Sequence, residues 1–213
     1  MQNNKKTDEN KPLHVLHVFG RLNRGGAESR VMDLYRNVDR TRIQFDFMQH
    51  TTKVCDFQTE IEQLGGKVYH VPPFRFWNYF SYCKAWKQFI KEHPEIRIVH
   101  GHMTSTASIY LPIVRKKGVF TIAHSRNAGV DKGIKGKLTK FLRRNLKEKC
   151  DRCFACSKLA GEAVFGKKAM EQGRVTIIPN AIDAARFTFD PEVRRQKREE
   201  LHIQPEELLI GEV

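Results

Sequence analysis

The sequence predicts an α/β fold, a doubly wound parallel sheet of the Rossmann-like kind, and three observations lead to that prediction. Residues Leu13 to Phe19 form a continuous apolar and β-branched run, interrupted only by two histidines, which is typical of a strand buried on both faces. A glycine loop and an amphipathic helix follow this run. Similar strands then alternate with helices along the chain, which indicates parallel strands joined by right-handed crossovers.

The elements follow one another in a regular order. Gly20 ends the first strand, and the loop after it leads to Gly25-Gly26-Ala27-Glu28. The next helix carries apolar residues at helical spacing, namely Val31, Leu34, Tyr35 and Val38. Later strands are predicted at residues 43–48, 67–71, 96–100, 119–123, 152–155 and 175–178. The intervening helices are predicted at 57–64, 79–90, 104–116, 134–149 and 158–165, with Pro112 counting against the third of them.

The ends of the chain differ from its middle. Residues 1–11 are polar and charged, so we expect a disordered leader and no secretion signal. Residues 12–189 are predicted to form one Rossmann-like domain. Residues 190–201 form a charged helical segment, and Leu208 begins a new apolar run. A strand of the buried type needs a partner, so residues 190–213 are interpreted as a linker helix and the first strand of a further domain.

Composition places the protein in a broad class. Of 213 residues, 40% are hydrophobic and 29% are charged, as in a water-soluble globular domain. No apolar run approaches the roughly 20 residues of a membrane-spanning helix. Five cysteines without a secretion signal argue against a disulfide framework and for a cytoplasmic location.

The net charge of +14 is concentrated in one segment. Between Lys132 and Lys149 there are eight basic residues and one acidic residue, a local charge of +7 on an amphipathic helix. This pattern predicts peripheral contact with an anionic membrane surface. The residues predicted to make it are Lys135, Lys137, Lys140, Arg143, Arg144 and Lys147. Few aromatic residues interleave these bases, which counts against binding of single-stranded nucleic acid.

Polar side chains gather where strands of the predicted sheet end, which is where open α/β sheets bind ligands. The glycine loop matches neither the dinucleotide fingerprint nor a P-loop, and it either faces a ligand or forms a tight turn with positive φ. His102 either caps the sheet or serves a site. His124-Ser125-Arg126-Asn127 directly follows another strand, and its imidazole, guanidinium and amide suit a polar substrate.

Three cysteines, Cys150, Cys153 and Cys156, have a spacing that suggests a metal site. Structural zinc needs four ligands, and these three span a helix end and a strand, so their side chains should diverge. We therefore expect them to pack as small apolar residues and predict no metal.

Taken together, these segments resemble the N-terminal half of a family 4 retaining glycosyltransferase with the GT-B fold, of the bacterial capsule or exopolysaccharide type. The resemblance runs from Leu13 to Val213. Its carriers are Gly25-Gly26-Ala27-Glu28, Val99-His100-Gly101-His102, Ile122-Ala123-His124-Ser125-Arg126-Asn127, Ala155-Cys156-Ser157 and Ile178-Pro179-Asn180-Ala181-Ile182-Asp183. The family usually has glycine where Ala181 stands. Two glutamate pairs separated by seven residues, Glu192/Glu200 and Glu199/Glu207, have the spacing of a family motif by coincidence.

The resemblance implies roles for particular residues. Gly25 and Gly26 would approach the donor diphosphate, and His124 would lie near the transferred sugar. The remaining residues implied in acceptor or substrate binding are Arg24, Glu28, His102, Ser125, Arg126, Asn127 and Asn180. The partners would be a nucleotide-sugar donor and a saccharide or lipid-linked acceptor, with no cofactor.

The function expected from the resemblance is retaining transfer of a sugar in cell-surface polysaccharide biosynthesis, with residues 1–213 alone inactive. Two alternatives stay open. A nicotinamide-dependent oxidoreductase would use the same sheet but lacks its glycine motif. A non-catalytic nucleic-acid-binding module would explain the charge, and it would show salt-dependent DNA binding.

Overall fold

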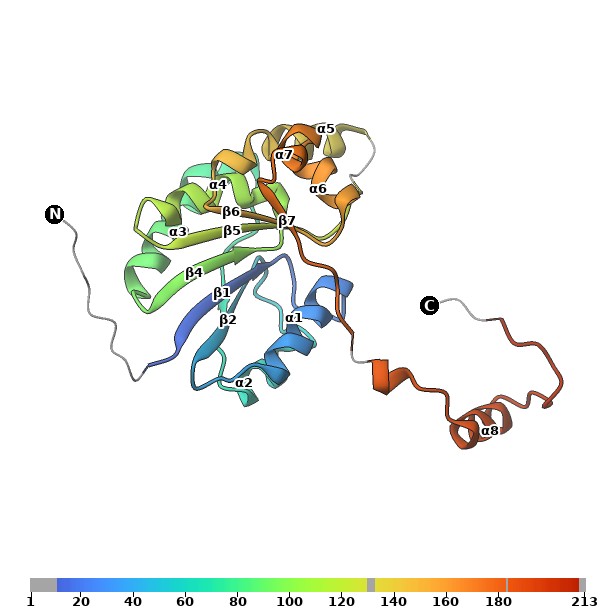
Figure 1. Ribbon diagram of the computed structural model, residues 1–213. Helices are drawn as coiled ribbons and strands as arrows, with labels where there is room; N and C mark the ends of the chain where they lie inside the picture. Colours follow the sequence, from blue (N-terminus) through green and yellow to red (C-terminus); the bar gives the residue numbers. More distant parts are fainter. Residues whose placement is uncertain (1–10, 130–132, 183, 211–213) are drawn as a thin grey trace. The chain divides into compact units, whose positions relative to one another are not determined.

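The protein is described by a computed structural model that covers residues 11–129, 133–182 and 184–210. Its centre is one sheet of seven parallel strands in the order β3-β2-β1-β4-β5-β6-β7 (Figure 1). The strands are β1 (Leu13–Phe19), β2 (Ile43–Gln49), β3 (Val68–His70), β4 (Ile96–Gly101), β5 (Phe120–Ser125), β6 (Arg152–Ala155) and β7 (Val175–Ile177). This confirms the predicted doubly wound parallel sheet. Because the strand order reverses at β1, the carboxyl ends of the neighbouring strands β1 and β4 form a topological switch point.

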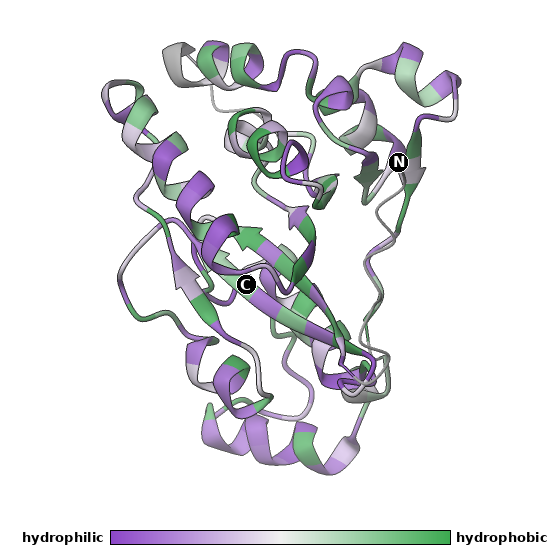
Figure 2. Cartoon of the chain, turned by 90° about the vertical axis from the view of Figure 1, so that its left-hand side faces the viewer, coloured by the Kyte–Doolittle hydropathy of each residue, from purple (hydrophilic) through white to green (hydrophobic). Residues whose placement is uncertain are grey.

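Helices cover the two faces of the sheet. Helices α1 (Gly26–Asn37) and α2 (Gln58–Gln63) lie on one face, beside β1 and β2. The other face carries α3 (Tyr79–Glu92), α4 (Thr104–Arg115), α6 (Lys158–Phe165) and α7 (Lys167–Glu171), with α5 (Gly133–Arg143) packed on α4. Short 3-10 helices lie at η1 (Phe76–Asn78) and η2 (Leu146–Glu148). Figure 2 shows apolar and polar residues alternating along these helices, as amphipathic packing requires.

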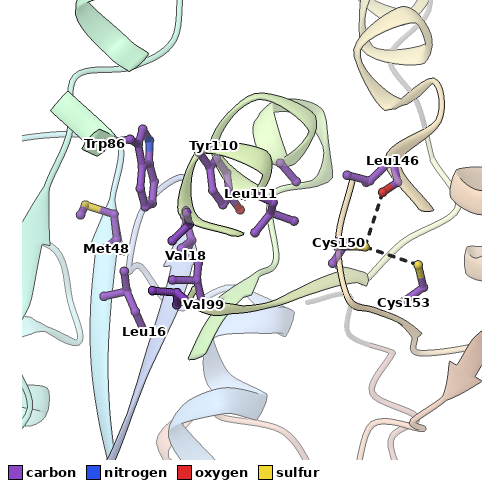
Figure 3. Packing of buried hydrophobic residues seen from close by; sticks show 14 of the residues in the cluster. Leu16, Val18, Met48, Trp86, Val99, Tyr110, Leu111, Leu146, Cys150 and Cys153 are labelled. Atoms are coloured by element: carbon purple, nitrogen blue, oxygen red, sulfur yellow. Dashed lines mark hydrogen bonds between the residues drawn. The ribbon is translucent and has the colours of Figure 1, made fainter. Parts of the chain in front are cut away.

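The alternating side chains of β1 divide the core in two. Val15 and Phe19 pack with α1 and the β2 aromatics, whereas Leu16 and Val18 pack with α3 and α4. On the larger side Trp86 is fully buried and stacks on Tyr110 with ring centroids 4.5 Å apart (Figure 3). Pro112 is accommodated inside α4, so the predicted helix is continuous.

The cysteines pack as predicted but do not all diverge. Cys150 and Cys153 are both buried, and their sulfur atoms lie 3.5 Å apart (Figure 3). The Cys150 thiol also contacts the Leu146 carbonyl oxygen at 3.4 Å. Cys156 is half-buried and its thiol donates to the Arg126 carbonyl oxygen. The expectation of divergence is wrong for the first pair because the chain turns sharply between η2 and β6.

The structure differs from two further expectations and contains one helix that was not predicted. The basic helix ends at Arg143 rather than Lys149, because Asn145 adopts left-handed backbone angles (φ 58°) and starts a 3-10 turn. Residues 208–210 form no strand and are exposed, and residues 211–213, the rest of the predicted strand, lie outside the described residues. Helix α7 was not predicted, since its five residues show no periodicity.

The chain divides into two compact units at Asn180 and Ala181. The second unit contains a 3-10 helix, η3 (Ala184–Phe187), and α8 (Pro191–Glu200). Asp190 caps α8 by accepting hydrogen bonds from the backbone N–H groups of Glu192 and Val193. Residues on α8 are mutually ion-paired, for example Arg195 with Glu192 and Glu199.

Candidate functional site

Four histidines meet at the carboxyl ends of β1, β4 and β5. His17 and His100 are register partners across β1 and β4, and His124 lies one strand further on β5. His102 follows β4 directly. Strand alternation places the first three of these side chains on the α1 face of the sheet, in line with Val15 and Phe19.

Hydrogen bonds join the four rings in two pairs. Nε2 of His100 lies 3.0 Å from Nδ1 of His124, and Nδ1 of His17 lies 3.0 Å from Nε2 of His102. Phe19 stacks on His102 with centroids 4.4 Å apart and ring planes 5° apart. These contacts fix the orientation of each imidazole.

The histidines are kept neutral by their surroundings. Burial, followed by the charge of Arg126, lowers the pKa of His124 to about 3. Burial is also the largest cause of the lowered pKa of His17, about 3, and of the pKa values of His100 and His102, which lie well below the usual range. Neutral imidazoles can donate and accept hydrogen bonds but provide no charge at neutral pH.

Arg126 supplies the positive charge at this edge of the sheet. Its Nε–H donates to Nδ1 of His102 at 3.1 Å, and its Nη1–H donates to Oδ1 of Asn180 at 3.2 Å. The guanidinium is partly buried, and burial lowers its pKa. The side chain borders a pocket of about 510 Å³. The other lining residues are Phe19, Gly20, Arg21, Gly26, Ala27, Glu28, His102, Met103, Asn127 and Asn180.

The glycine loop forms the other wall of this pocket. Gly25 is the N-cap of α1 and has no side-chain cap. Neither Gly25 nor Gly26 has positive φ, so the tight-turn interpretation is wrong for both. A Cβ atom on Gly25 would instead collide with Oε2 of Glu28. Burial raises the pKa of the Glu28 carboxyl group, although a hydrogen bond from its own backbone N–H lowers it in part.

The predicted substrate residues fall into two groups. Gly26, Glu28, His102, Arg126, Asn127 and Asn180 all line the pocket. Ser125 does not, because its hydroxyl donates to the Ala160 carbonyl oxygen at 2.8 Å and serves to pack β5 on α6. Arg24 is exposed on the loop, where its backbone N–H bonds Asp56.

His124 does not line the pocket and is only 1% exposed. Its Nε2 is buried and makes no hydrogen bond within the part of the chain that the structure describes. A buried polar atom without a partner costs about 1–3 kcal/mol, so this nitrogen calls for a ligand or a water molecule. The predicted contact of His124 with a sugar stays a prediction.

The sequence analysis missed His17 and gave no role to His100. Strand parity could have identified His17, since it lies between Val15 and Phe19 on one face. Nitrogen atoms of His17, His100 and His102 lie within 4.8 Å of one another, the one grouping of metal-ligand type among the described residues. Their rings are stacked, and the Arg126 cation bonds one of them. Both features favour a hydrogen-bonded cluster over a cation site.

The predicted membrane residues lie on and after α5. Lys137, Lys140 and Arg144 are exposed, and Lys147 is half-buried. Arg143 is partly buried, with Nε and Nη1 shielded from solvent, so it is the least available of the group. The side chain of Lys135 lies outside the described residues.

A groove of about 1130 Å³ lies between α3, α4 and the end of α5. Its apolar wall includes Tyr79, Phe80, Ile113, Phe141 and Leu142. Its basic rim is formed by Lys84, Lys87, Lys116, Lys117, Arg144 and Lys149, and none of the described residues that line it is acidic. Phe80 is 85% exposed and Phe141 67% exposed. Among the described helices, none combines the length and apolar character needed to cross a bilayer.

Comparison with known proteins places these features in a family. Residues 24–186 match the sequence profile of Glycosyltransferase Family 4. EpsF of Bacillus subtilis strain 168, named as a glycosyltransferase, is 33% identical over 204 residues, which are 93% of this chain and 53% of the relative. The capsular polysaccharide biosynthesis glycosyltransferase CapH of Staphylococcus aureus is 30% identical over 91 residues, 43% of this chain and 24% of CapH.

Solved structures show the same fold. HepE of Anabaena, crystallised with UDP, superposes with a TM-score of 0.63 at 14% identity, over 90% of this chain and 50% of HepE. At that identity the likeness shows the Rossmann-like fold of GT-B glycosyltransferases and nothing more. The chain spans about half the length of EpsF and of HepE.

Proposed function

Because the chain belongs to glycosyltransferase family 4, we propose that it is part of an enzyme that transfers a sugar from a nucleotide-diphosphate donor during bacterial capsule or exopolysaccharide biosynthesis. The observation that carries this proposal is the pocket at the carboxyl ends of β1, β4 and β5, inside the segment that matches the family. EpsF and CapH support the pathway, and the fold shared with HepE, which was crystallised with UDP, is consistent with a nucleotide-diphosphate donor.

In this proposal the N-terminus of α1 faces the donor diphosphate, which the helix dipole and the backbone N–H groups of the glycine loop stabilise as it leaves. His102, Arg126, Asn127 and Asn180 hold the acceptor. The unpartnered Nε2 of His124 reaches a hydroxyl of the transferred sugar. Transfer proceeds with retention of anomeric configuration, and no cofactor takes part.

A second proposal concerns domain organisation. Residues 12–189 form the acceptor-side domain, and residues 190–213 lead to a donor-binding domain encoded beyond them. The coverage of about half of each relative supports this division. Residues 1–213 alone would therefore not turn over, because half of the donor site is missing.

The enzyme works in the cytoplasm, in our proposal, with its basic surface against the inner face of the plasma membrane. The groove between α3, α4 and α5 supports this, since an apolar wall with a basic rim suits acyl chains and anionic headgroups. Each basic residue near such a surface contributes about 1 kcal/mol. A lipid-linked acceptor would then be presented from the membrane.

Vesicle binding tests the membrane proposal. Replacing Lys116 and Arg144, two exposed bases on the rim of the groove, together by Gln should weaken binding to phosphatidylglycerol-containing vesicles by roughly 30-fold, from about 1 kcal/mol per charge. The matched control replaces Lys167 and Lys168 of α7, exposed bases outside the groove, and should leave binding unchanged. Equal losses in both double variants would mean that net charge acts without a docking surface.

Calorimetric titration tests the catalytic proposal against its alternatives. The longest available product of this gene is titrated with UDP, GDP, NAD and a short DNA duplex at two salt concentrations. Binding of UDP or GDP by that product, but not by residues 1–213, is the expected result. Tight NAD binding, or salt-sensitive DNA binding without nucleotide diphosphate binding, would refute the proposal.

A further inference from the structure

The guanidinium of Arg126 is a partly buried cation that forms no salt bridge with the described residues, although the charge of Glu28 acts on it from a distance. Within the described residues no carboxylate oxygen lies within 4 Å of it, and both of its hydrogen-bond partners, His102 and Asn180, are uncharged. Glu28 lines the same pocket but lies beyond ion-pair distance. A buried charge that only neutral groups hold is costly unless an ion of opposite sign joins it.

The histidines behind Arg126 are locked in one protonation pattern. A guanidinium can only donate, so Nδ1 of His102 must be the acceptor and carry no proton. Neutral His102 is then protonated on Nε2, which donates to Nδ1 of His17 at 3.0 Å. His17 is in turn protonated on Nε2, a buried atom that makes no hydrogen bond with the described residues. The chain of bonds therefore runs in one direction, away from Arg126.

This arrangement orients Arg126 without neutralising it. Its Nε and Nη1 are tied to His102 and Asn180, and Phe19 stacks on the His102 ring from the side. Nη2 makes no hydrogen bond with the described residues, and the side chain borders the pocket. A planar guanidinium with free N–H groups suits an oxyanion, which it can bind through two parallel hydrogen bonds.

The pocket has the size and surroundings for such a ligand. Its volume of about 510 Å³ falls in the range of about 300–1,000 Å³ that is usual for small-molecule sites. Arg21 and the first residues of α1, Gly26 and Ala27, line it as well. Arg21 adds a second positive side chain and the start of α1 adds the positive end of a helix dipole, whereas Glu28 is the one acidic side chain among the described lining residues.

We propose that Arg126 recognises an oxyanion on the acceptor, a phosphate or a carboxylate, so that the acceptor of this enzyme is an anionic saccharide or a sugar phosphate. The identification of this ligand as the acceptor rests on the proposed function. The anion site itself rests on the geometry of Arg126, His102 and Asn180. The donor diphosphate is the other source of the same chemistry, and the experiment separates the two.

The test compares matched sugars on residues 1–213 and on the longest gene product, at constant ionic strength. Glucose 1-phosphate and glucuronate are each titrated against glucose, with binding followed by calorimetry or NMR. At least one charged sugar should bind 10-fold or more tightly than glucose. Arg126→Gln should reduce that ratio to 3-fold or less, with Arg126→Lys in between, since Lys keeps the charge but loses the planar fork.

Arg97→Gln is the matched control, an exposed arginine at the amino end of β4 that should leave the ratio unchanged. Equal binding of charged and neutral sugars, or selectivity that survives Arg126→Gln, overturns the proposal. So does a 10-fold loss of UDP binding by the longest product in Arg126→Gln without a loss of sugar selectivity. If anion selectivity depends on Arg126 but no nucleotide diphosphate binds, the proposed function fails and the anion site stands.

Discussion

Acidification should destabilise this fold strongly, because burial disfavours the charged form of its histidines in the folded state but not in the unfolded chain. The pKa values of His17 and His124 are lowered from 6.5 to about 3 by burial. Between these values the unfolded chain binds more protons than the folded one, so stability is complete above pH 6.5 and is lost as the pH falls toward 3. From pH 7 to pH 5 the loss is about 2 kcal/mol for each histidine, or about 4 kcal/mol for the two.

Urea unfolding at pH 7 and pH 5 measures this loss, followed by the fluorescence of the fully buried Trp86. His17→Phe should reduce the difference between the two pH values by about 2 kcal/mol. This substitution keeps an aromatic ring beside Phe45, whose ring centroid lies 4.3 Å from that of His17. The control His202→Asn changes an exposed histidine with left-handed backbone angles, which Asn tolerates. A wild-type difference below about 1 kcal/mol would refute the reasoning.

Two core substitutions test the packing that supports the site. Gly101→Ala would place a Cβ atom against the buried hydroxyl of Tyr110 and 3.5 Å from the Ile122 carbonyl oxygen. It should cost about 1–3 kcal/mol in urea unfolding, and an unchanged midpoint would contradict the close approach. Trp86→Ala removes the ring that stacks on Tyr110 and should cost about 3–5 kcal/mol by thermal unfolding monitored by circular dichroism. A loss below 1 kcal/mol would mean that α3 is not held by this contact.

Local patterns in the sequence were sufficient to predict the sheet. The apolar run at Leu13 to Phe19 and the later predicted strands become parallel strands, because strand segments that alternate with helical segments are typical of a parallel sheet. Element ends were less predictable. Asn145 stops the basic helix early through its own backbone angles, which no periodicity records. Residues 208–210 carry a strand-like pattern, but a strand forms only where a partner is present.

The sequence indicated which residues belong to the candidate site better than it indicated how they are arranged. His102, Arg126 and Asn180 are far apart in the sequence, and the fold brings them into hydrogen-bond contact. Which histidines pair depends on the face of the sheet toward which each strand turns its side chains. The face that His17 occupies was not predicted from the sequence. Ser125 was grouped with its neighbours in the chain, although strand alternation turns its hydroxyl toward α6.

The most direct test of the account is a transfer assay on the longest product of this gene. The protein is incubated with UDP- and GDP-sugars and a panel of anionic and neutral saccharide acceptors, and the anomeric configuration of any product is read by NMR. The account predicts a product that retains the configuration of the donor, formed with an anionic acceptor and not by residues 1–213 alone. A product of inverted configuration, or transfer by residues 1–213 at the rate of the longer protein, would contradict it.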